Sequence, residues 1–293
     1  MGLGYVDLRN LIEFRGSLGS RSGAVATLGR QELHLHPVDL RKLKALAGHD
    51  TRAQSFFDSY CWGEYVDRFF VEVLEFSRVD SIDLSDYQGA TIIHDLSTPL
   101  PEKLIGRYDL AVDGGTLEHV FNFPTALANL MRLARIGGAV YSQAPANNHC
   151  GHGFYQFSPE LFFRVFGPSN GFEAKFVRIA VKHTTHHSVY DVMDPEKLGR
   201  RVPLLSKRPT TLMCLSIRTE DRELFKSGIF QSDYSRIWAG GGQGQGSWLQ
   251  KLSQALAGHV PISIHDYLRA LYWRRNNSLR NRAIYRKLWE NNR

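Results

Sequence analysis

The chain has 293 residues, of which 43% are hydrophobic and 22% are charged, a balance typical of a globular protein with a full core. Its formal net charge of +7 favours an acidic partner or substrate without choosing between nucleic acid, anionic lipid and phosphorylated molecules. No apolar run approaches the ~20 residues of a membrane span, and three scattered cysteines without a CxxC pair exclude a disulfide framework and a zinc knuckle. We therefore expect a cytoplasmic protein with reduced thiols.

The first part of the chain predicts a short strand and two helical stretches. Residues 1–22 read as a short amphipathic piece followed by a flexible lead-in. A buried strand is expected at residues 24–28, and a helix that begins with proline at residues 37–47. A second helical stretch at residues 54–76 has an aromatic side, which is more typical of core than of a ligand cage. We interpret it as an insertion in the first crossover.

Strand signals then recur, with helices or turns between them, at residues 79–82, 90–94, 110–112, 138–142, 175–181 and 211–217. A helical pattern beginning near Leu117 runs on through Leu127, Leu130 and Leu133. Strands separated by helical patterns predict a mostly parallel sheet with right-handed crossovers. We therefore predict an α/β domain at residues 23–220, with a seven-stranded sheet and helices on both faces.

The C-terminal part differs in composition. Residues 240–246 form a glycine- and glutamine-rich break, and residues 247–293 read as helical and basic. The last 25 residues contain eight Lys or Arg against one Glu, interleaved with Tyr and Trp. A solvated helical face accounts for this pattern, and an anionic membrane surface, an acidic partner or nucleic acid are the alternatives. We therefore predict a separate basic helical extension at residues 221–293.

Three consecutive predicted strands end in carboxylates, namely Asp83, Asp95 and Asp113. In open α/β sheets, ligands bind at the carboxyl ends of the strands. A carboxylate suits a ribose diol after the second strand and an exocyclic amine after the third, because both groups donate hydrogen bonds. Gly114 and Gly115 follow directly and allow close approach to the backbone. The pattern predicts an adenine nucleoside across the strand ends.

These residues resemble those of class I S-adenosylmethionine-dependent methyltransferases. The resemblance covers about residues 22–218 and is carried by five segments, at residues 81–86, 93–96, 108–113, 117–120 and 130–138. It implies a Rossmann-like fold, S-adenosylmethionine as cofactor, and methyl transfer to an oxygen or nitrogen of a small molecule or glycan intermediate. It also implies the cofactor-binding residues Gly29, Arg30, Asp83, Leu84, Asp95, Leu96, Asp113 and Gly114.

The first loop departs from the family pattern. The family usually has Gly-x-Gly-x-Gly after its first strand, whereas this chain has only Gly29 there, followed by Arg30 and Gln31. Asp83 also comes 54 residues after Gly29, far beyond the ~20 residues of a standard dinucleotide unit. The cofactor is therefore held differently or is not used.

Histidines supply candidates for a general base. His149 and His152 lie in a glycine-containing loop after the fifth strand, and His119 lies after the fourth. Imidazole titrates near neutral pH and can take a proton from the acceptor, so we take these three histidines and Asp113 as catalytic candidates. No metal is expected, because the Glu-x-x-Glu-His run of some metal-binding relatives lacks its first glutamate here.

Two other functions remain open. The positive charge and the basic, aromatic tail favour a nucleic-acid methyltransferase, although the Asp/Asn-Pro-Pro-Tyr/Phe motif of base methylation is absent after the fourth strand. The single-glycine loop favours a degenerate methyltransferase fold that serves as a binding module. Homo-oligomerisation also remains open.

Overall fold

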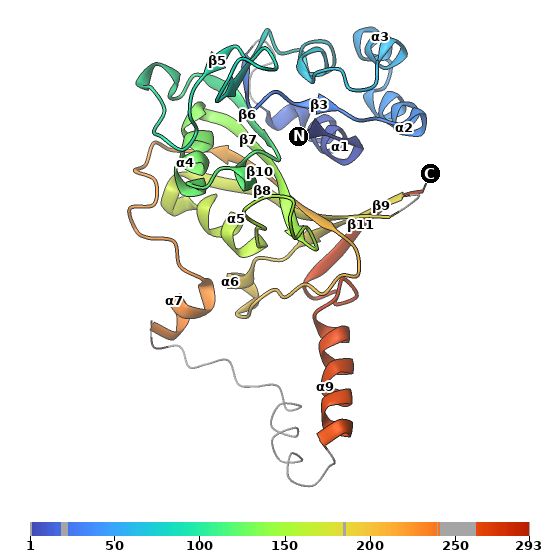
Figure 1. Cartoon of the computed structure of the whole chain (residues 1–293), viewed down its shortest axis with the longest axis vertical. Coiled ribbons are helices and arrows are strands. Elements are labelled where there is room, and N and C mark those ends of the chain that lie inside the picture. Colours follow the sequence, from blue (N-terminus) through green and yellow to red (C-terminus); the bar gives the residue numbers. More distant parts are fainter. Residues whose placement is uncertain (1, 19–22, 184–185, 239, 241–261, 293) are drawn as a thin grey trace.

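The computed structural model describes residues 2–18, 23–183, 186–238, 240 and 262–292 (Figure 1). Its centre is a nine-stranded sheet in the order β11-β9-β8-β10-β7-β6-β2-β4-β5. The strands are β2 (Ala24–Leu28), β4 (Arg78–Asp83), β5 (Ile92–Ile93), β6 (Tyr108–Gly114), β7 (Ala134–Asn147), β8 (Phe172–Lys182), β9 (His186–Val192), β10 (Thr210–Arg218) and β11 (Tyr285–Asn292). A separate two-stranded sheet joins β1 (Gly2–Leu3) to β3 (Glu32–Leu33).

The strand directions confirm the predicted α/β fold with a mostly parallel sheet. Every neighbouring pair from β5 to β7 is parallel. β10 runs antiparallel to both β7 and β8, and β9 runs antiparallel to both β8 and β11. All strands of the described sheet except β9 and β10 therefore point the same way. The prediction of seven strands was wrong, because β9 and β11 extend the sheet at one edge.

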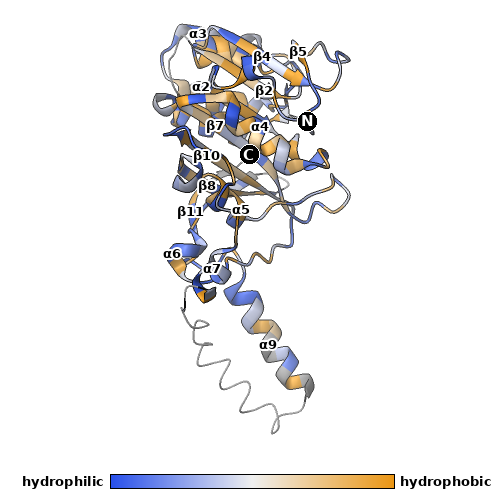
Figure 2. Ribbon diagram, turned by 90° about the vertical axis from the view of Figure 1, so that its left-hand side faces the viewer, coloured by the Kyte–Doolittle hydropathy of each residue, from blue (hydrophilic) through white to orange (hydrophobic). Residues whose placement is uncertain are grey.

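Helices cover both faces of the sheet (Figures 1 and 2). α4 (Phe123–Leu133) and α5 (Pro159–Val165) pack on one face, and α1 (Tyr5–Glu13), α2 (Pro37–Ala47) and α3 (Thr51–Ser59) pack on the other. Successive residues of one strand point to opposite faces. In β6, Ala111 therefore belongs to the cluster under α4, whereas Leu110 and Val112 belong to the cluster under α1. This two-sided burial explains why the strand reads as a continuous apolar run.

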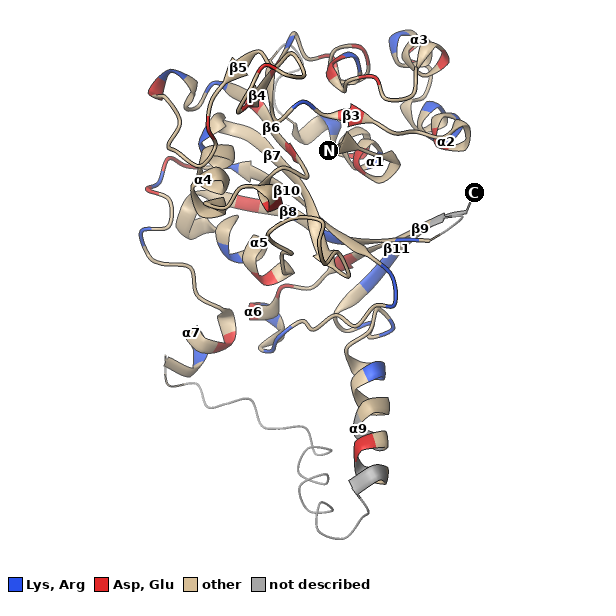
Figure 3. Ribbon diagram, in the orientation of Figure 1, with Lys and Arg blue, Asp and Glu red and all other residues tan. Residues whose placement is uncertain are grey.

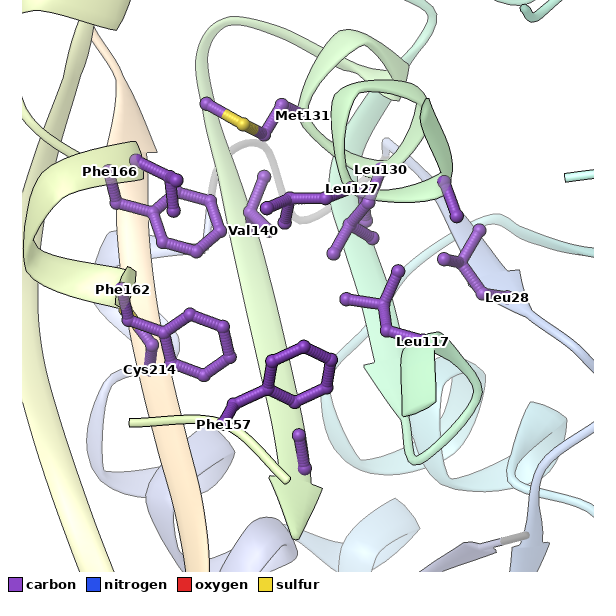
Figure 4. Close-up of a cluster of buried hydrophobic side chains, with 14 of the residues drawn as sticks. Leu28, Leu117, Leu127, Leu130, Met131, Val140, Phe157, Phe162, Phe166 and Cys214 are labelled. Atoms are coloured by element: carbon purple, nitrogen blue, oxygen red, sulfur yellow. The ribbon is translucent and has the colours of Figure 1, made fainter. Parts of the chain in front are cut away.

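The core under α4 and α5 is rich in leucine and phenylalanine. Figure 4 shows Leu127 and Leu130 of α4 facing the sheet, and Phe162 and Phe166 of α5 beside them. Val140 of β7 lies between the two helices, and all five side chains are at least 98% buried. This packing fixes where β6 and β7 end, and thus where their loops lie.

Several element boundaries differ from the sequence predictions. The stretch at residues 54–76 is not one helix: α3 ends at Ser59, and a π-helical turn at Phe69–Val73 (η2) follows after a break. In that break, Tyr65 pairs with Glu32. The helical pattern from Leu117 is also divided, into the 3-10 turn η4 (Leu117–His119) and the helix α4. Pro124 lies in the first turn of α4, where proline is favoured, so a new helix begins there.

The fifth strand is longer than predicted. β7 begins at Ala134 rather than at Gly138, because Ala134 already pairs with Tyr108. The register then shifts between Tyr108 and Leu110, and Gly137 takes a positive φ of 76° at that irregularity. Gly137 and Gly138 therefore lie inside a strand.

Both ends of the chain join the core. Leu8 and Leu11 of α1 are fully buried, which confirms the amphipathic piece near the N-terminus. At the other end α9 (Ile262–Asn276) extends away from the body, but β11 pairs with β9. The prediction of an entirely helical extension is therefore wrong for Tyr285–Asn292. The glycine-rich break at residues 241–246 lies outside the described residues, and the proposed domain boundaries stay predictions.

The remaining short elements are η1 (Arg15–Ser17), η3 (Glu102–Leu104), η5 (Pro168–Asn170), α6 (Pro195–Leu198) and α7 (Ser232–Trp238). Basic residues are visible on β11 and α9 in Figure 3. Of these, Arg286 pairs with Asp191 of β9 at 2.5 Å, so it also ties β11 to the sheet. Among the described helices, none combines the length and the apolar character that crossing a membrane requires.

Candidate functional site

The strand order creates a switch point between β2 and β6. From β2 the chain crosses to β4 and then β5 on one side, and it returns to β6 on the other side of β2. In open α/β sheets, the carboxyl ends of the strands at such a switch point are where ligands bind. The predicted cofactor residues lie there, Gly29 just after β2 and Gly114 at the end of β6.

The loop after β2 is held mainly by its own contacts. Gly29 has a φ of 71°, and its N–H donates to the Ile82 carbonyl at 2.7 Å. The Arg30 guanidinium stacks on the Tyr65 ring at 4.3 Å and pairs with Asp67 at 3.4 Å. Arg30 therefore anchors the inserted segment, which is a structural role that its sequence position did not reveal.

The carboxylates after β4 and β5 lie on neighbouring strand ends. The His94 N–H donates to the Asp83 carbonyl at 2.8 Å, which joins the two ends. Asp83 is half-buried, and its carboxylate accepts from the Leu84 N–H at 2.7 Å. Asp95 is exposed, and its carboxylate accepts from the hydroxyl and the N–H of Ser97 at 2.7 and 2.9 Å. These bonds from Ser97 lower the pKa of Asp95.

The two leucines that follow these carboxylates have opposite environments. Leu84 is exposed, so it can contact a bound ligand. Leu96 is buried in the core under α4, where it contributes to packing.

Asp113 is enclosed at the end of β6. One carboxylate oxygen accepts from the Thr116 N–H at 2.8 Å, and the other accepts from the Ser142 hydroxyl at 2.8 Å. Its side chain is completely buried, and this burial raises the pKa of Asp113 to about 6. Asp113 thus shapes the turn after β6 and ties it to β7.

The space over Gly114 is filled by the chain itself. A Cβ at Gly114 would lie 2.4 Å from Gln31 Oε1 and 2.9 Å from a methyl group of Leu3. The Gln31 amide nitrogen donates to the Leu28 carbonyl and, at 3.3 Å, to the Thr116 hydroxyl. Gln31 Oε1 is buried and has no hydrogen-bond partner among the described residues. Because buried polar atoms are normally hydrogen-bonded, Gln31 Oε1 is an acceptor at the switch point that lacks a donor.

Glu118, His119 and His152 meet beside this turn, although His152 comes from the loop after β7. The Nε2 atoms of His119 and His152 lie 3.9 and 3.4 Å from Glu118 Oε1. Glu118 is 1% exposed, and burial together with the nearby Asp113 raises its pKa to about 8. The structure thus brings two of the predicted histidines together around a glutamate that the sequence analysis did not include among the site residues.

His149 connects this cluster to a cavity. Its ring lies 5.7 Å from that of His152, and its Nε2 atom is buried without a hydrogen-bond partner among the described residues. Burial, followed by the charge of His152, lowers the pKa of His149, while burial also lowers that of His119. The sequence prediction of a histidine-rich region at the sheet edge therefore has a defined geometry.

The cavity has a volume of about 480 Å³ and lies between the N-terminal segment and the carboxyl ends of β7 and β8. Its lining includes residues from six parts of the chain: Gly2–Asp7, His34, His36, Asp39, Trp62, Gln143, His149, Ala180, Lys182, His187, Pro209, Thr211 and Met213. Sequence analysis missed it, because its N-terminal wall was read as a lead-in. Gln143 pairs in register with Gly114, so the cavity adjoins the switch point.

Comparisons with known proteins give little beyond the fold. No protein-family model and no curated protein matches the chain. Among solved structures, similarity is found to the 16S rRNA (adenine(1408)-N(1))-methyltransferase from Catenulisporales acidiphilia. That match has 14% identity and a TM-score of 0.37, and it covers 74% of this chain and 95% of that one.

Two further solved structures are similar at the same level. A putative methyltransferase from Bacillus halodurans C-125 has 11% identity and a TM-score of 0.38, with 73% of this chain and 100% of that one covered. An S-adenosylmethionine-dependent methyltransferase from Clostridium acetobutylicum ATCC 824 has 8% identity and a TM-score of 0.33, with 74% and 93% covered. Because all these TM-scores are below 0.5, we base the fold on the strand order and draw no functional conclusion from the similarities.

Proposed function

We propose that this protein binds S-adenosylmethionine at the switch point between β2 and β6 and transfers its methyl group to an oxygen or nitrogen of an acceptor in the neighbouring cavity. One observation carries the proposal. Carboxylates follow β4 and β5 on one side of the switch point, and a cavity lies at the ends of β7 and β8 on the other, with Gly114 between them. A cofactor and an acceptor can thus meet at one point.

The residues on the β4–β5 side fit an adenine nucleoside. Asp83 would accept the ribose hydroxyls and Asp95 the adenine amine, since both carboxylates end neighbouring strands at the same edge. Gln31 Oε1, the buried acceptor without a partner, would accept a hydrogen bond from the ammonium group of the methionine part. A side-chain contact from Gln31 would thus take the place of the glycine-rich first loop that this chain lacks. Arg30 would keep its structural role on Tyr65 and Asp67.

The cavity fits a small polar acceptor with a ring or sugar. Its volume of about 480 Å³ is within the range of small-molecule sites. Trp62 lies 5.3 and 5.1 Å from the rings of His34 and His36, and the three mutually inclined rings form one aromatic side of the cavity. Lys182 and Asp39 add charged groups that can orient the acceptor. A cavity of about 480 Å³ is too small to hold duplex nucleic acid, so we favour a small molecule or a glycan intermediate.

The chain itself needs to supply positioning and one proton acceptor. When bound, S-adenosylmethionine supplies a methyl group that is already activated. His149 lines the cavity and carries a buried Nε2 atom without a partner, so it is placed to accept the acceptor's proton as the new bond forms. The cofactor would supply the methyl carbon to the acceptor oxygen or nitrogen and would keep the electron pair of the broken bond on its sulfur, while His149 would take up the acceptor's proton.

Calorimetric titration with S-adenosylmethionine and with its demethylated product tests the proposal. The unmodified protein should bind both ligands, and Asp83→Ala should weaken binding by about 5- to 150-fold, because loss of a charged acceptor costs about 1–3 kcal/mol. Asp86→Ala, which removes an exposed carboxylate from the same loop, is the matched control and should bind normally. Absence of binding to the unmodified protein would favour the alternative of a degenerate binding module.

A further inference from the structure

We propose that Glu118, His119 and His152 together bind a divalent transition-metal ion. The three side chains come from two segments that are separated by more than 30 positions in the sequence, namely η4 and the loop after β7. One ligand atom from each lies within 4.8 Å of the others. The sequence prediction of no metal relied on the missing first glutamate of the run at residues 115–119, and His152 lies outside that run.

The distances suit a metal better than an ion pair. A cation about 2.0–2.2 Å from nitrogen and oxygen ligands keeps those ligands about 3–3.5 Å apart. The Nε2 atom of His152 lies 3.4 Å from Glu118 Oε1, and that of His119 lies 3.9 Å from it. Both separations exceed the usual 2.7–3.2 Å of a hydrogen bond from nitrogen to oxygen. An inward movement of His119 would bring its Nε2 atom as close to Glu118 Oε1 as that of His152 is, and would complete the three ligands of one ion.

The buried carboxylate of Glu118 also lacks a hydrogen-bond partner for one of its oxygens. Glu118 is 1% exposed, and its Oε2 atom has no hydrogen-bond partner among the described residues. A buried carboxylate is costly unless it is paired or coordinates a metal. A bound cation would supply the missing partner.

The backbone holds the two ligand segments together. The N–H groups of Phe154 and Tyr155 both donate to the Glu118 carbonyl, at 2.8 and 3.3 Å. A Cβ at Gly153 would lie 2.8 Å from that same carbonyl, so glycine permits the close approach. The Tyr155 hydroxyl further donates to the Phe121 carbonyl at 2.7 Å. The loop that carries His152 is thus fixed against η4 before any ion binds.

The ligand set and its exposure indicate the kind of ion and site. Two imidazoles and one carboxylate suit Zn²⁺, Mn²⁺, Fe²⁺ or Co²⁺ better than Mg²⁺ or Ca²⁺, which prefer oxygen. The side chains of His119 and His152 are 39% and 52% exposed, so further coordination positions face solvent. Three protein ligands with an open position are typical of metal sites that also bind a substrate or water. The proposal does not depend on methyl transfer.

Titration of the untagged, chelator-treated full chain with Zn²⁺ tests this site, with Co²⁺ as a spectroscopic probe. We expect one ion per chain with micromolar or tighter affinity, and visible d–d bands with Co²⁺. His152→Ala and Glu118→Gln should each weaken Zn²⁺ binding about 10- to 100-fold. His49→Ala, which removes an exposed histidine between α2 and α3, should bind as the unmodified protein does.

Two outcomes would overturn the proposal. One is no saturable Zn²⁺ binding by the unmodified chain at 100-fold excess of metal, and the other is one-to-one binding that survives His152→Ala unchanged. Because Glu118 is buried, its variant requires a circular dichroism spectrum to confirm folding. His152 lies in an exposed loop, so His152→Ala keeps the test decisive if Glu118→Gln fails to fold.

Discussion

Asp7 provides a test of how the N-terminal helix is joined to the sheet. Its carboxylate accepts from the Gly4 N–H at 2.9 Å and from the Tyr141 hydroxyl at 2.7 Å, and it is 5% exposed. Burial raises the pKa of Asp7 to about 6. Burial also raises the pKa of Tyr141 well above its usual value, so that hydroxyl remains a donor at every pH of interest.

The sign of the effect follows from proton linkage. The folded protein binds the Asp7 proton more tightly than the unfolded chain, whose pKa is near 3.8. The stabilising contribution is therefore complete below about pH 4 and is lost as the pH rises through 6. A difference of about two pKa units corresponds to about 3 kcal/mol in the free energy of unfolding.

Asp7→Asn should remove this pH dependence. The asparagine oxygen can still accept from Tyr141, but the bond from the Gly4 N–H is lost. Urea unfolding at several pH values between 4 and 8 gives the free energy of each protein. We expect the difference between unmodified protein and variant to shrink by up to about 3 kcal/mol across that range. Other buried carboxylates, such as Asp113, are present in both proteins and cancel in this difference.

Parallel pH profiles for the two proteins would refute this reasoning. Asp86→Asn removes an exposed carboxylate and should give a profile parallel to that of the unmodified protein. A change of shape in the control would mean that charge number alone, rather than burial at Asp7, determines the profile.

Three further variants test the site and the core. Gly114→Ala should lower the free energy of unfolding by about 1–3 kcal/mol in urea, since the added Cβ would lie 2.4 Å from Gln31 Oε1. Tyr285→Ala should lower it by about 3–5 kcal/mol, because this residue of β11 is 99% buried. His149→Ala should slow single-turnover methyl transfer by about 10²–10⁴-fold and leave cofactor affinity nearly unchanged, once an acceptor is identified.

Each of these variants has a matched control. Gly16→Ala adds a Cβ that meets nothing within 4 Å, and Tyr267→Ala removes a tyrosine that is 64% exposed. Both should leave stability within about 0.5 kcal/mol of the unmodified protein. His49→Ala should retain the normal single-turnover rate. Equal losses in Tyr285→Ala and Tyr267→Ala would contradict the inclusion of β11 in the core, and a normal rate for His149→Ala would exclude it as the base.

The sequence by itself determined the positions of most strands and the fold class. Strands such as Ala24–Leu28 and Tyr108–Gly114 are buried on both faces, so they appear as continuous apolar runs that end abruptly at a glycine or a carboxylate. Asp83 and Asp95 were predicted as cofactor ligands because parallel strands bring their carboxyl ends to one edge. The local sequence pattern is sufficient to predict a strand where consecutive residues of that strand are all buried.

Only the tertiary structure decided the roles of individual site residues. Asp83, Asp95 and Asp113 look alike in sequence, yet Asp113 is enclosed by Thr116 and Ser142 while Asp95 is exposed. The meeting of Glu118 with His152 depends on backbone bonds between segments that are distant in the chain. Contacts between distant segments produce no periodic pattern of residue types in the sequence, so the sequence analysis could not predict them.

The N-terminal wall of the cavity and the strand β11 were hidden for the same physical reason. Tyr285–Asn292 alternates poorly and is rich in charge, so nothing local distinguishes it from a solvated helix. Its pairing with β9 supplies the backbone partners and the burial of Tyr285 that make it a strand. Edge strands are stabilised by what lies beside them, and the amino-acid sequence of the strand does not contain that information.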